Sequence, residues 1–160
     1  MRPKKDALSR VAKSKGPMLR QREHWRSVAK REFPEHEEFW SDKSEEYGIY
    51  NLFFQLRGEL AQAVAQGDPN KPKKIIAFGN QCLRNELASD GEDIDGAAGV
   101  SLFEHLFEDT PPNNWTTLLS IMTQSGYNDC RHYVEQWMDT AAFSRLEAEA
   151  KKYFSSKAAS

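Results

Sequence analysis

Residues 49–65, with the sequence IYNLFFQLRGELAQAVA, carry the apolar pattern around which the rest of the chain is organised. One row of side chains recurs there at the spacing of a helix face: Ile49, Phe53, Leu56, Leu60 and Val64. We expect a wider apolar face that also includes Tyr50, Leu52, Phe54 and Ala61. Burying one large apolar side chain contributes roughly 1.5–3 kcal/mol, whereas a whole domain is stable by about 5–15 kcal/mol. The pattern therefore predicts a buried central helix against which the other helices pack.

Helical patterns flank this segment on both sides, and no stretch of useful length alternates as a β-strand does. Before it, the spacing predicts a helix over residues 18–33 and a short acidic segment over residues 35–40. After it, we expect an exposed turn over residues 68–74, a helix over residues 75–87 and a loop over residues 89–99. Short connections of this kind are typical of helices that pack as neighbours along the chain.

Capping boxes, in which Ser, Thr or Asp precedes Glu by three positions, predict two helix starts, at Asp42–Glu45 and at Ser101–Glu104. A further helix is expected to end at Gly126. The last helical stretch, over residues 128–153, is either continuous or broken at residues 139–140. The side chains of this stretch that we expect to face the core are Cys130, Val134, Trp137 and Met138.

These elements predict an all-α fold, a single-domain bundle of roughly six helices around the central apolar helix, with a basic N-terminal tail. Residues 1–16 would be the flexible basic tail, residues 17–154 the helical domain, and residues 155–160 a disordered C-terminus. A chain of 160 residues is long enough for one domain with a substantial core. Cys82 and Cys130 fall on apolar helix positions, where we expect two buried free thiols, with a disulfide between them as the alternative.

The net charge of −2 conceals two segments of opposite charge. Residues 1–31 hold eleven basic and two acidic side chains, which gives +9, and the other 129 residues hold eleven basic and twenty-two acidic ones, which gives −11. No run of about eighteen apolar residues is present, so we expect no membrane span. The basic N-terminus lacks the apolar segment of a secretory signal, which predicts a cytoplasmic protein, with an organellar transit peptide as the lesser alternative.

The motifs that carry catalysis or metal binding are missing, so we expect no enzyme, no catalytic residues, no metal and no cofactor. The four histidines show no H-x-x-x-H spacing, and the sequence contains no C-x-x-C, no G-x-S-x-G and no glycine-rich phosphate loop. Asp93, Asp95 and Gly96 suit the third, fifth and sixth places of an EF-hand loop. That register, however, puts Gly91 and Leu102 where acidic ligands are needed, so a solvated acidic loop is the better interpretation.

Two sets of charged residues are candidates for binding a partner. The acidic set should face outward, because the apolar helix faces are committed to the core: Glu92, Asp93, Asp95, Glu104, Glu108 and Asp109. Acidic surfaces of this kind attract basic proteins. The basic set includes one aromatic residue and suits contacts with a nucleic acid: Arg20, Arg22, Trp25, Arg26, Lys30 and Arg31. If the basic segment does not bind a nucleic acid, we expect that it keeps the protein soluble or folds back on the acidic body.

Three segments give residues 33–137 a resemblance to small helical bacterial proteins of uncharacterised function, including immunity proteins that neutralise the toxin of a neighbouring cell. They are the aromatic start of the central helix with Tyr50, Phe53 and Phe54, the segment SLFEHLF at residues 101–107, and the closing helix at residues 127–137. The resemblance implies a protein that binds another protein, and it assigns no site residue.

The leading hypothesis is a non-enzymatic protein-binding module, such as an immunity or inhibitor protein, whose acidic body engages a basic partner. A nucleic-acid-associated factor that uses residues 1–31 is the alternative. An enzyme whose site is not visible in local motifs is the second alternative. The three hypotheses predict different features of the folded chain, which are an acidic surface, an accessible basic segment and a catalytic site.

Overall fold

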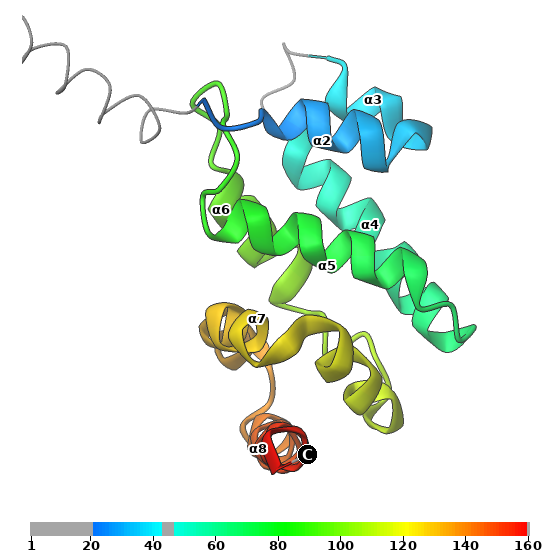
Figure 1. Cartoon of the computed structure of the whole chain (residues 1–160), viewed down its shortest axis with the longest axis vertical. Coiled ribbons are helices and arrows are strands. Elements are labelled where there is room, and N and C mark those ends of the chain that lie inside the picture. The colour runs from blue at the N-terminus through cyan, green and yellow to red at the C-terminus, as the bar shows by residue number, and fades with distance from the viewer. Residues whose placement is uncertain (1–20, 43–46, 160) are drawn as a thin grey trace, which may run out of the picture.

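Helices in the described part of the chain form an all-α, single-domain bundle (Figure 1). The computed structural model describes residues 21–42 and 47–159. In chain order the α-helices are α2 (Trp25–Glu32), α3 (Glu37–Trp40), α4 (Gly48–Ala65), α5 (Asn70–Leu83), α6 (Ile94–Ala97), α7 (Trp115–Trp137) and α8 (Thr140–Ala159). The single turns are the 3₁₀ turns η2 (Pro34–His36) and η4 (Pro112–Asn114) and the π-helical turn η3 (Ala98–Phe103). The predicted fold class is confirmed.

The central helix is α4, as predicted, and its core-facing row is fully enclosed. Five of its side chains are each 0% exposed: Ile49, Leu52, Phe53, Leu56 and Leu60. α4 packs against α3, α5 and η3, while α7 packs against α5 and α8. Figure 1 accordingly shows α2 and α3 at one end of the molecule, α4 and α5 in the middle, and α7 with α8 at the other end.

The apolar face of α4 is narrower than expected. Phe54 is 49% exposed, so the expectation that it widens the buried face is wrong, and Tyr50 is only half-buried. Successive residues of an α-helix are rotated by about 100°, so Phe53 and Phe54 cannot both face the centre of the same neighbouring layer. The core therefore takes one row of α4, and a second aromatic row remains at the surface.

Several helix ends differ from the predicted ones near α4. The helix starts after Tyr47, whose side chain makes no capping hydrogen bond, so the capping box at Asp42–Glu45 does not begin it; Glu45 lies outside the described residues. Gly67 ends this region with φ 75°, as its position predicts. α5 begins earlier than expected because Pro72, in its first turn, has no N–H to leave unsatisfied, so most of the expected exposed turn is helical.

The region predicted as a loop and a capping box is also helical. α6 begins at Ile94, and the Asp93 carboxylate caps it by accepting a hydrogen bond from the Gly96 N–H at 3.0 Å. Ser101 is 0% exposed inside η3 and does not cap a helix, so the predicted start at that residue is wrong. The acidic sequence therefore starts a helix eight residues earlier than its Ser-x-x-Glu motif indicates, since Asp93 and not Ser101 is the capping residue.

α7 contains a break, and α8 is longer than expected. Thr123 has φ 67° and ψ 162°, and its hydroxyl accepts a hydrogen bond from the Gly126 N–H at 3.3 Å, which caps the second half of α7. Of the two alternatives for the last helical stretch, the structure has the break, because α7 ends at Trp137 and α8 begins at Thr140. α8 continues through residues 155–159, which we expected to be disordered, and the tail at residues 1–16 lies outside the described residues. Trp137, expected to face the core, is 59% exposed.

Two further expectations concern the state of the cysteines and the presence of a membrane-spanning helix. Cys82 and Cys130 are free and buried, as their apolar positions predict, and burial raises the pKa of both thiols. None of the helices among the described residues combines the length and the apolar character needed to cross a membrane.

Replacing Phe53 with Ala should lower the free energy of unfolding by about 3–5 kcal/mol, because the change removes a buried aromatic ring from the core. The Phe53 ring stacks on that of Phe78, with 5.2 Å between centroids. Phe54→Ala is the matched control one residue along the same helix, and it should cost less than about 1 kcal/mol. Urea denaturation measures both losses, and equal values would contradict the assigned core face.

A carboxylate on α4 joins the η2 turn to α5. Glu59 lies 2.6 Å from His36 Nε2 and accepts a hydrogen bond from Lys71 Nζ at 2.6 Å. Burial by itself raises the pKa of the Glu59 carboxyl, but Lys71 and His36 outweigh burial and hold this pKa below its ordinary value. The folded protein therefore stabilises the ionised form of Glu59.

Replacing Glu59 with Gln should lower the stability at neutral pH by about 1 kcal/mol, a value that allows for screening by solvent. Because the folded-state pKa is lowered, the stabilisation is complete above the unfolded value of about 4.3 and is lost as the pH falls through the folded value. Thermal melts of the wild type and Glu59→Gln should therefore converge on the acid side. Glu38→Gln, at an exposed position on α3, is the control, and a difference that persists in acid would refute the link.

Candidate functional site

The basic and acidic segments that were predicted to bind different partners contact each other. Arg26 Nη2 donates a hydrogen bond to Glu92 Oε2 at 2.8 Å, and Trp25 Nε1 donates one to Glu92 Oε1 at 3.1 Å. Arg26 Nη1 also donates to the backbone carbonyl of Trp40 at 3.1 Å. The side chains of Arg26 and Glu92 are only 9% and 12% exposed. We call this group of Trp25, Arg26 and Glu92 the charge clamp.

Backbone hydrogen bonds bring the two halves of the charge clamp together. The Trp25 N–H donates to the Ala88 carbonyl at 3.0 Å, and the Ala88 N–H donates to the Glu23 carbonyl at 2.8 Å. His24 starts α2 by accepting a hydrogen bond from the Arg26 N–H on its Nδ1 at 3.1 Å. Backbone hydrogen bonds alone therefore hold the segment after α5 against the start of α2.

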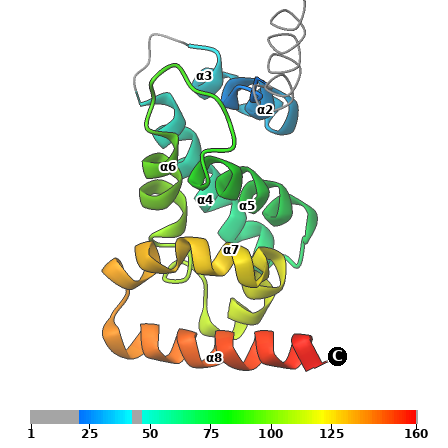
Figure 2. The same ribbon diagram turned by 60° about the vertical axis from the view of Figure 1, so that its left-hand side comes forward.

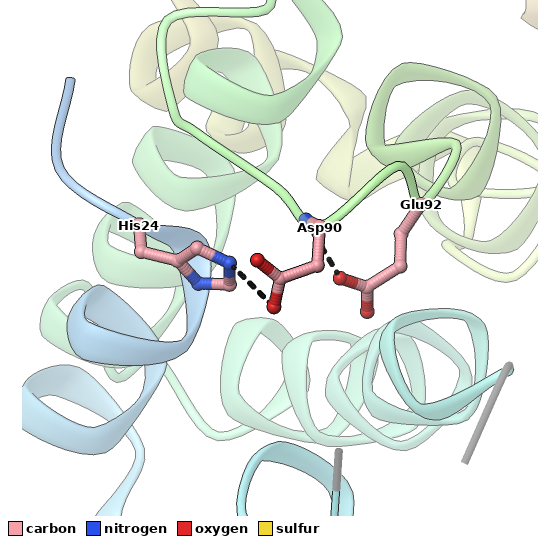
Figure 3. A group of neighbouring side chains, drawn as sticks. All are labelled: His24, Asp90 and Glu92. Carbon is pink, nitrogen blue, oxygen red and sulfur yellow. Dashed lines mark hydrogen bonds and ion pairs between the residues drawn. The ribbon is translucent and has the colours of Figure 1, made fainter. Parts of the chain in front are cut away.

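His24, Asp90 and Glu92 lie beside one another at this corner, and they have the chemistry of metal ligands (Figure 3). His24 Nε2 is 3.2 Å from Asp90 Oδ2, and the Asp90 N–H donates to Glu92 Oε1 at 3.2 Å. Both oxygens of Glu92 already accept hydrogen bonds, and the guanidinium of Arg26 lies where a metal cation would be repelled. The geometry fits a structural clamp better than a metal site.

The structure removes two members of the predicted basic set from the surface. Trp25 is 0% exposed and Arg26 is 8% exposed, so the expectation that they contact a nucleic acid from the surface is wrong. Their side chains serve the charge clamp instead. The exposed Arg22 and Lys30 remain, Arg31 pairs with a neighbouring glutamate at 2.7 Å, and Arg20 lies outside the described residues.

The acidic set is also divided. Glu104 is 3% exposed and Glu92 belongs to the charge clamp, so the expectation that both carboxylates face outward is wrong. Glu108 and Asp109 are exposed, and each contacts a basic group, at 2.8 Å from a His105 ring nitrogen and 2.9 Å from an Arg57 nitrogen respectively. The carboxylates of Asp93 and Asp95 lie near the surface without such an ion pair among the described residues.

Large apolar side chains, including Phe54 and Trp137, which the sequence pattern assigned to the core, are exposed on elements that pack against one another. The large apolar residues exposed in the described part are Tyr47 (57%), Phe54 (49%), Val100 (45%) and Trp137 (59%). They come from the start of α4, from η3 and from the end of α7. With the half-buried Tyr50 and Tyr133 they form what we call the aromatic surface, defined by Tyr47, Tyr50, Phe54, Val100, Tyr133 and Trp137.

Packing between the elements connects the aromatic surface. The π-helical turn η3 contacts both α4 and α7, and its Gly99 lies against the ring of Tyr133 on α7. The rings of Tyr47 and Tyr50 are 6.1 Å apart, and the Trp137 ring is 5.6 Å from that of His105. Figure 2 shows the start of α4, then α6 with the turn that follows it, then the end of α7, one below another along the left-hand side.

A glycine allows this close arrangement. A Cβ on Gly99 would lie 2.3 Å from the Tyr133 ring, which is too close for any other residue without a shift. The carbonyl of Gly99 accepts the Glu104 N–H at 2.8 Å, a bond between residues five apart that defines the π-helical turn. Such turns occur frequently at functional sites. The local geometry therefore places this face, more than the charge clamp, among the candidates for function.

A second helical row was the signal that could have identified these residues in the sequence. Tyr50 and Phe54 are four positions apart, as are Tyr133 and Trp137, so each pair shares one helix face. In both helices this row runs beside the row that fills the core. A face that carries two adjacent apolar rows is wider than one neighbouring helix can cover, and the surplus is exposed.

Comparison with known proteins supplies a family but no activity. Residues 27–138 match the family model described as Domain of unknown function (DUF7674). The matched segment runs from within α2 to just beyond the end of α7, and it contains every residue of the aromatic surface, whereas α8 lies outside it. No curated protein and no solved structure matches the chain.

Replacing Glu92 with Ala should destabilise the fold by roughly 3 kcal/mol, because it leaves the guanidinium of Arg26 buried without its partner. Asp90→Ala is the matched control in the same segment, since the Asp90 side chain is 65% exposed and its contact with His24 is a surface ion pair worth about 0–1 kcal/mol. Denaturant titration compares the two variants. A loss from Glu92→Ala no larger than that from Asp90→Ala would contradict the charge clamp.

Proposed function

The chain belongs to the DUF7674 family, whose description assigns no activity, and we propose that it is a non-enzymatic protein-binding module. Its aromatic surface engages a basic partner protein, and the acidic side chains beside that surface select the partner. In its narrower form, the proposal makes the chain an immunity or inhibitor protein that covers a basic site on its target.

The observation that carries the proposal is the gathering of large exposed apolar side chains on one face. Tyr47, Phe54, Val100 and Trp137 come from three separate elements, and η3, which carries Val100, packs against both of the helices that carry the others. Exposing such side chains to water is unfavourable, and contiguous groups of them mark interaction sites. Tyrosine and tryptophan are also the residues most enriched among those that dominate binding energy in protein interfaces.

The charge of the described residues supports a basic partner. Residues 21–42 and 47–159 together hold fourteen basic and twenty-one acidic side chains, which gives −7. Asp93, Asp95, Glu108 and Asp109 border the aromatic surface. An apolar centre with charges at the rim is typical of protein interfaces, and the rim charges increase the rate of association with a partner of opposite charge.

The positions of the two thiols support a non-enzymatic protein. Cys82 and Cys130 are 0% exposed, and burial raises the pKa of both thiols, which keeps them as unreactive thiols at neutral pH. His36 is buried, and its Nε2 lies 2.6 Å from the Glu59 carboxylate, which also accepts a hydrogen bond from Lys71. The surroundings of the two thiols and of His36 therefore support a structural role for these groups.

Site-specific photocrosslinking tests the surface directly. A benzophenone amino acid placed at Phe54 or at Trp137 should crosslink the full chain to the same basic protein in a lysate of its source cells. The control position is Ser144, which is exposed on α8. Adducts of equal yield from the control position, adducts with nucleic acid, or adducts with an acidic protein would each overturn the proposal.

Replacing Trp137 with Ala should weaken the complex with the crosslinked partner at least about 10-fold, because an exposed tryptophan at an interface centre commonly contributes 2 kcal/mol or more. The melting temperature should change little, since Trp137 is 59% exposed. Tyr153→Ala, at a half-buried aromatic position on α8, is the control and should leave the affinity within about twofold. Calorimetric titration gives both affinities, and an unchanged affinity for Trp137→Ala would contradict the proposed interface.

A further inference from the structure

A cavity of about 390 Å³ lies where the segment before α7 meets the junction between α7 and α8. Its lining includes the buried residues Phe107, Trp115 and Met138, so much of its wall is apolar. Ligand sites are typically cavities of about 300–1,000 Å³ whose apolar walls carry a few polar groups. The cavity therefore has the size and the apolar wall of a site for a small group.

The charged residues that line this cavity are all acidic. Glu108 and Asp109 come from the segment before α7, and Asp139 comes from the link between α7 and α8; all three are exposed. No basic residue of the described chain lines the cavity. The two segments are far apart in the sequence, so tertiary packing brings their carboxylates to one cavity, where they attract a cation.

Each of these carboxylates uses one oxygen for a contact within the described residues. Glu108 Oε1 is 2.8 Å from His105 Nδ1, and Asp109 Oδ2 is 2.9 Å from Arg57 Nε. Asp139 Oδ2 accepts a hydrogen bond at 3.2 Å from a backbone N–H in the first turn of α8. The second oxygen of each carboxylate has no partner within the same part of the chain, so it remains an acceptor for a ligand.

Thr110 adds a buried hydroxyl to the lining of the cavity. The residue is 2% exposed, and its hydroxyl has no hydrogen-bond partner among the described residues. Its backbone carbonyl, by contrast, accepts a hydrogen bond from Trp115 Nε1 at 3.0 Å, which holds the residue in place. Buried hydroxyls are nearly always hydrogen-bonded, because leaving one without a partner is unfavourable. The hydroxyl therefore indicates a hydrogen-bonding ligand, and the carboxylates indicate that this ligand is positively charged.

The cavity adjoins the aromatic surface. Met138, which lines the cavity, directly follows Trp137, which is 59% exposed. The Trp137 ring is 5.6 Å from that of His105, whose Nδ1 contacts Glu108 in the cavity lining. A partner protein that covers Trp137 therefore lies beside the cavity.

We propose that this cavity holds one lysine side chain of the basic partner. We call it the lysine pocket and define it by Glu108, Asp109, Thr110, Met138 and Asp139. The inference rests on the proposed function, because it names a group through which that partner binds. A lysine combines an apolar four-carbon stem with a compact ammonium that has three donors. The stem packs on the apolar wall, while the ammonium donates to the hydroxyl and to the carboxylates.

An ammonium fits this lining better than a guanidinium or a metal ion does. The acceptors come from two segments, and the three rotatable donors of an ammonium reach acceptors in several directions, whereas a guanidinium prefers carboxylates in its own plane. Two groups of described residues have ligand atoms close enough together for a metal ion, and neither includes a carboxylate of the lysine pocket: His24–Asp90–Glu92 and Glu35–His36–Glu59.

Nuclear magnetic resonance titration of the full chain tests the lysine pocket without knowledge of the partner. The probe is N-acetyl-lysine-N-methylamide, and the same compound with a hydroxyl in place of the ammonium is the neutral control. We expect saturable shifts of the Thr110, Asp139 and Ala142 amides with the lysine probe and none with the control. Absence of these shifts, equal shifts from both compounds, tighter binding of N-acetyl-arginine-N-methylamide, or equal shifts of the Asp93 and Asp95 amides would each overturn the inference.

Replacing Thr110 with Val separates recognition from folding, because valine has the shape of threonine without the hydroxyl. Binding of the lysine probe should weaken at least about fivefold, as expected for loss of a hydrogen bond to a charged group. The melting temperature should stay the same or rise, since the hydroxyl has no partner to lose among the described residues. Thr110→Ser keeps the hydroxyl and should bind within about twofold of the wild type. Unchanged binding by Thr110→Val, or a marked fall in its melting temperature, contradicts the lysine pocket.

Replacing Asp139 with Asn tests the charge of the pocket. Asparagine also accepts hydrogen bonds at the start of a helix, so the first turn of α8 is preserved. Binding of the lysine probe should weaken at least about threefold, because one carboxylate of the lining is neutralised. Glu135→Gln, at an exposed position on α7, is the matched control and should bind as the wild type does. Equal losses from Asp139→Asn and Glu135→Gln would mean that only the overall charge attracts the probe, which contradicts the pocket.

The two proposals can fail separately. Binding of the lysine probe without any crosslink from Phe54 or Trp137 would leave the lysine pocket in place and remove the protein-binding function. A crosslinked basic partner whose affinity is unaffected by Thr110→Val and Asp139→Asn would leave the function in place and remove the lysine pocket.

Discussion

The cluster of three phenylalanines in the core, one pair stacked and one pair edge to face, is the contact on which the other layers depend. Phe78 on α5 lies against Phe53 of α4 at 5.2 Å and against Phe33, just after α2, at 5.5 Å between centroids. All three rings are at most 1% exposed, and aromatic pairs in these geometries add to the stabilisation from burial itself. This cluster commits one row of α4 to the interior and so decides which of its aromatic residues remain outside.

The packing of the chain also brings oppositely charged side chains together. Arg26 and Glu92 lie in segments of opposite net charge, and the backbone bond between Trp25 and Ala88 brings them together at 2.8 Å. The pair is nearly enclosed, so neither group is available to an outside partner. Part of the opposite charge of the two segments is thus used inside the fold.

The proposed interface lies where the backbone of η3 packs closely against the ring of Tyr133. Gly99 allows η3 to approach Tyr133, and the turn then supports Val100 at 45% exposure between the aromatic residues of two helices. Glu104 directly follows η3, and as a residue it is only 3% exposed. A rigid backbone that holds aromatic rings and carboxylates in place is well suited to binding, because little conformational freedom is lost on association.

The sequence alone determined the all-α class, the central position of α4 and the apolar placement of Cys82 and Cys130, because the spacing of apolar residues is a local property of the chain. It could not determine which of two adjacent apolar rows is covered, since Phe53 and Phe54 differ only in what other helices lie beside them. Nor could it pair Arg26 with Glu92, which are 66 positions apart. Tertiary packing decided these points, because burial and ion pairing depend on contacts between segments that no local pattern encodes.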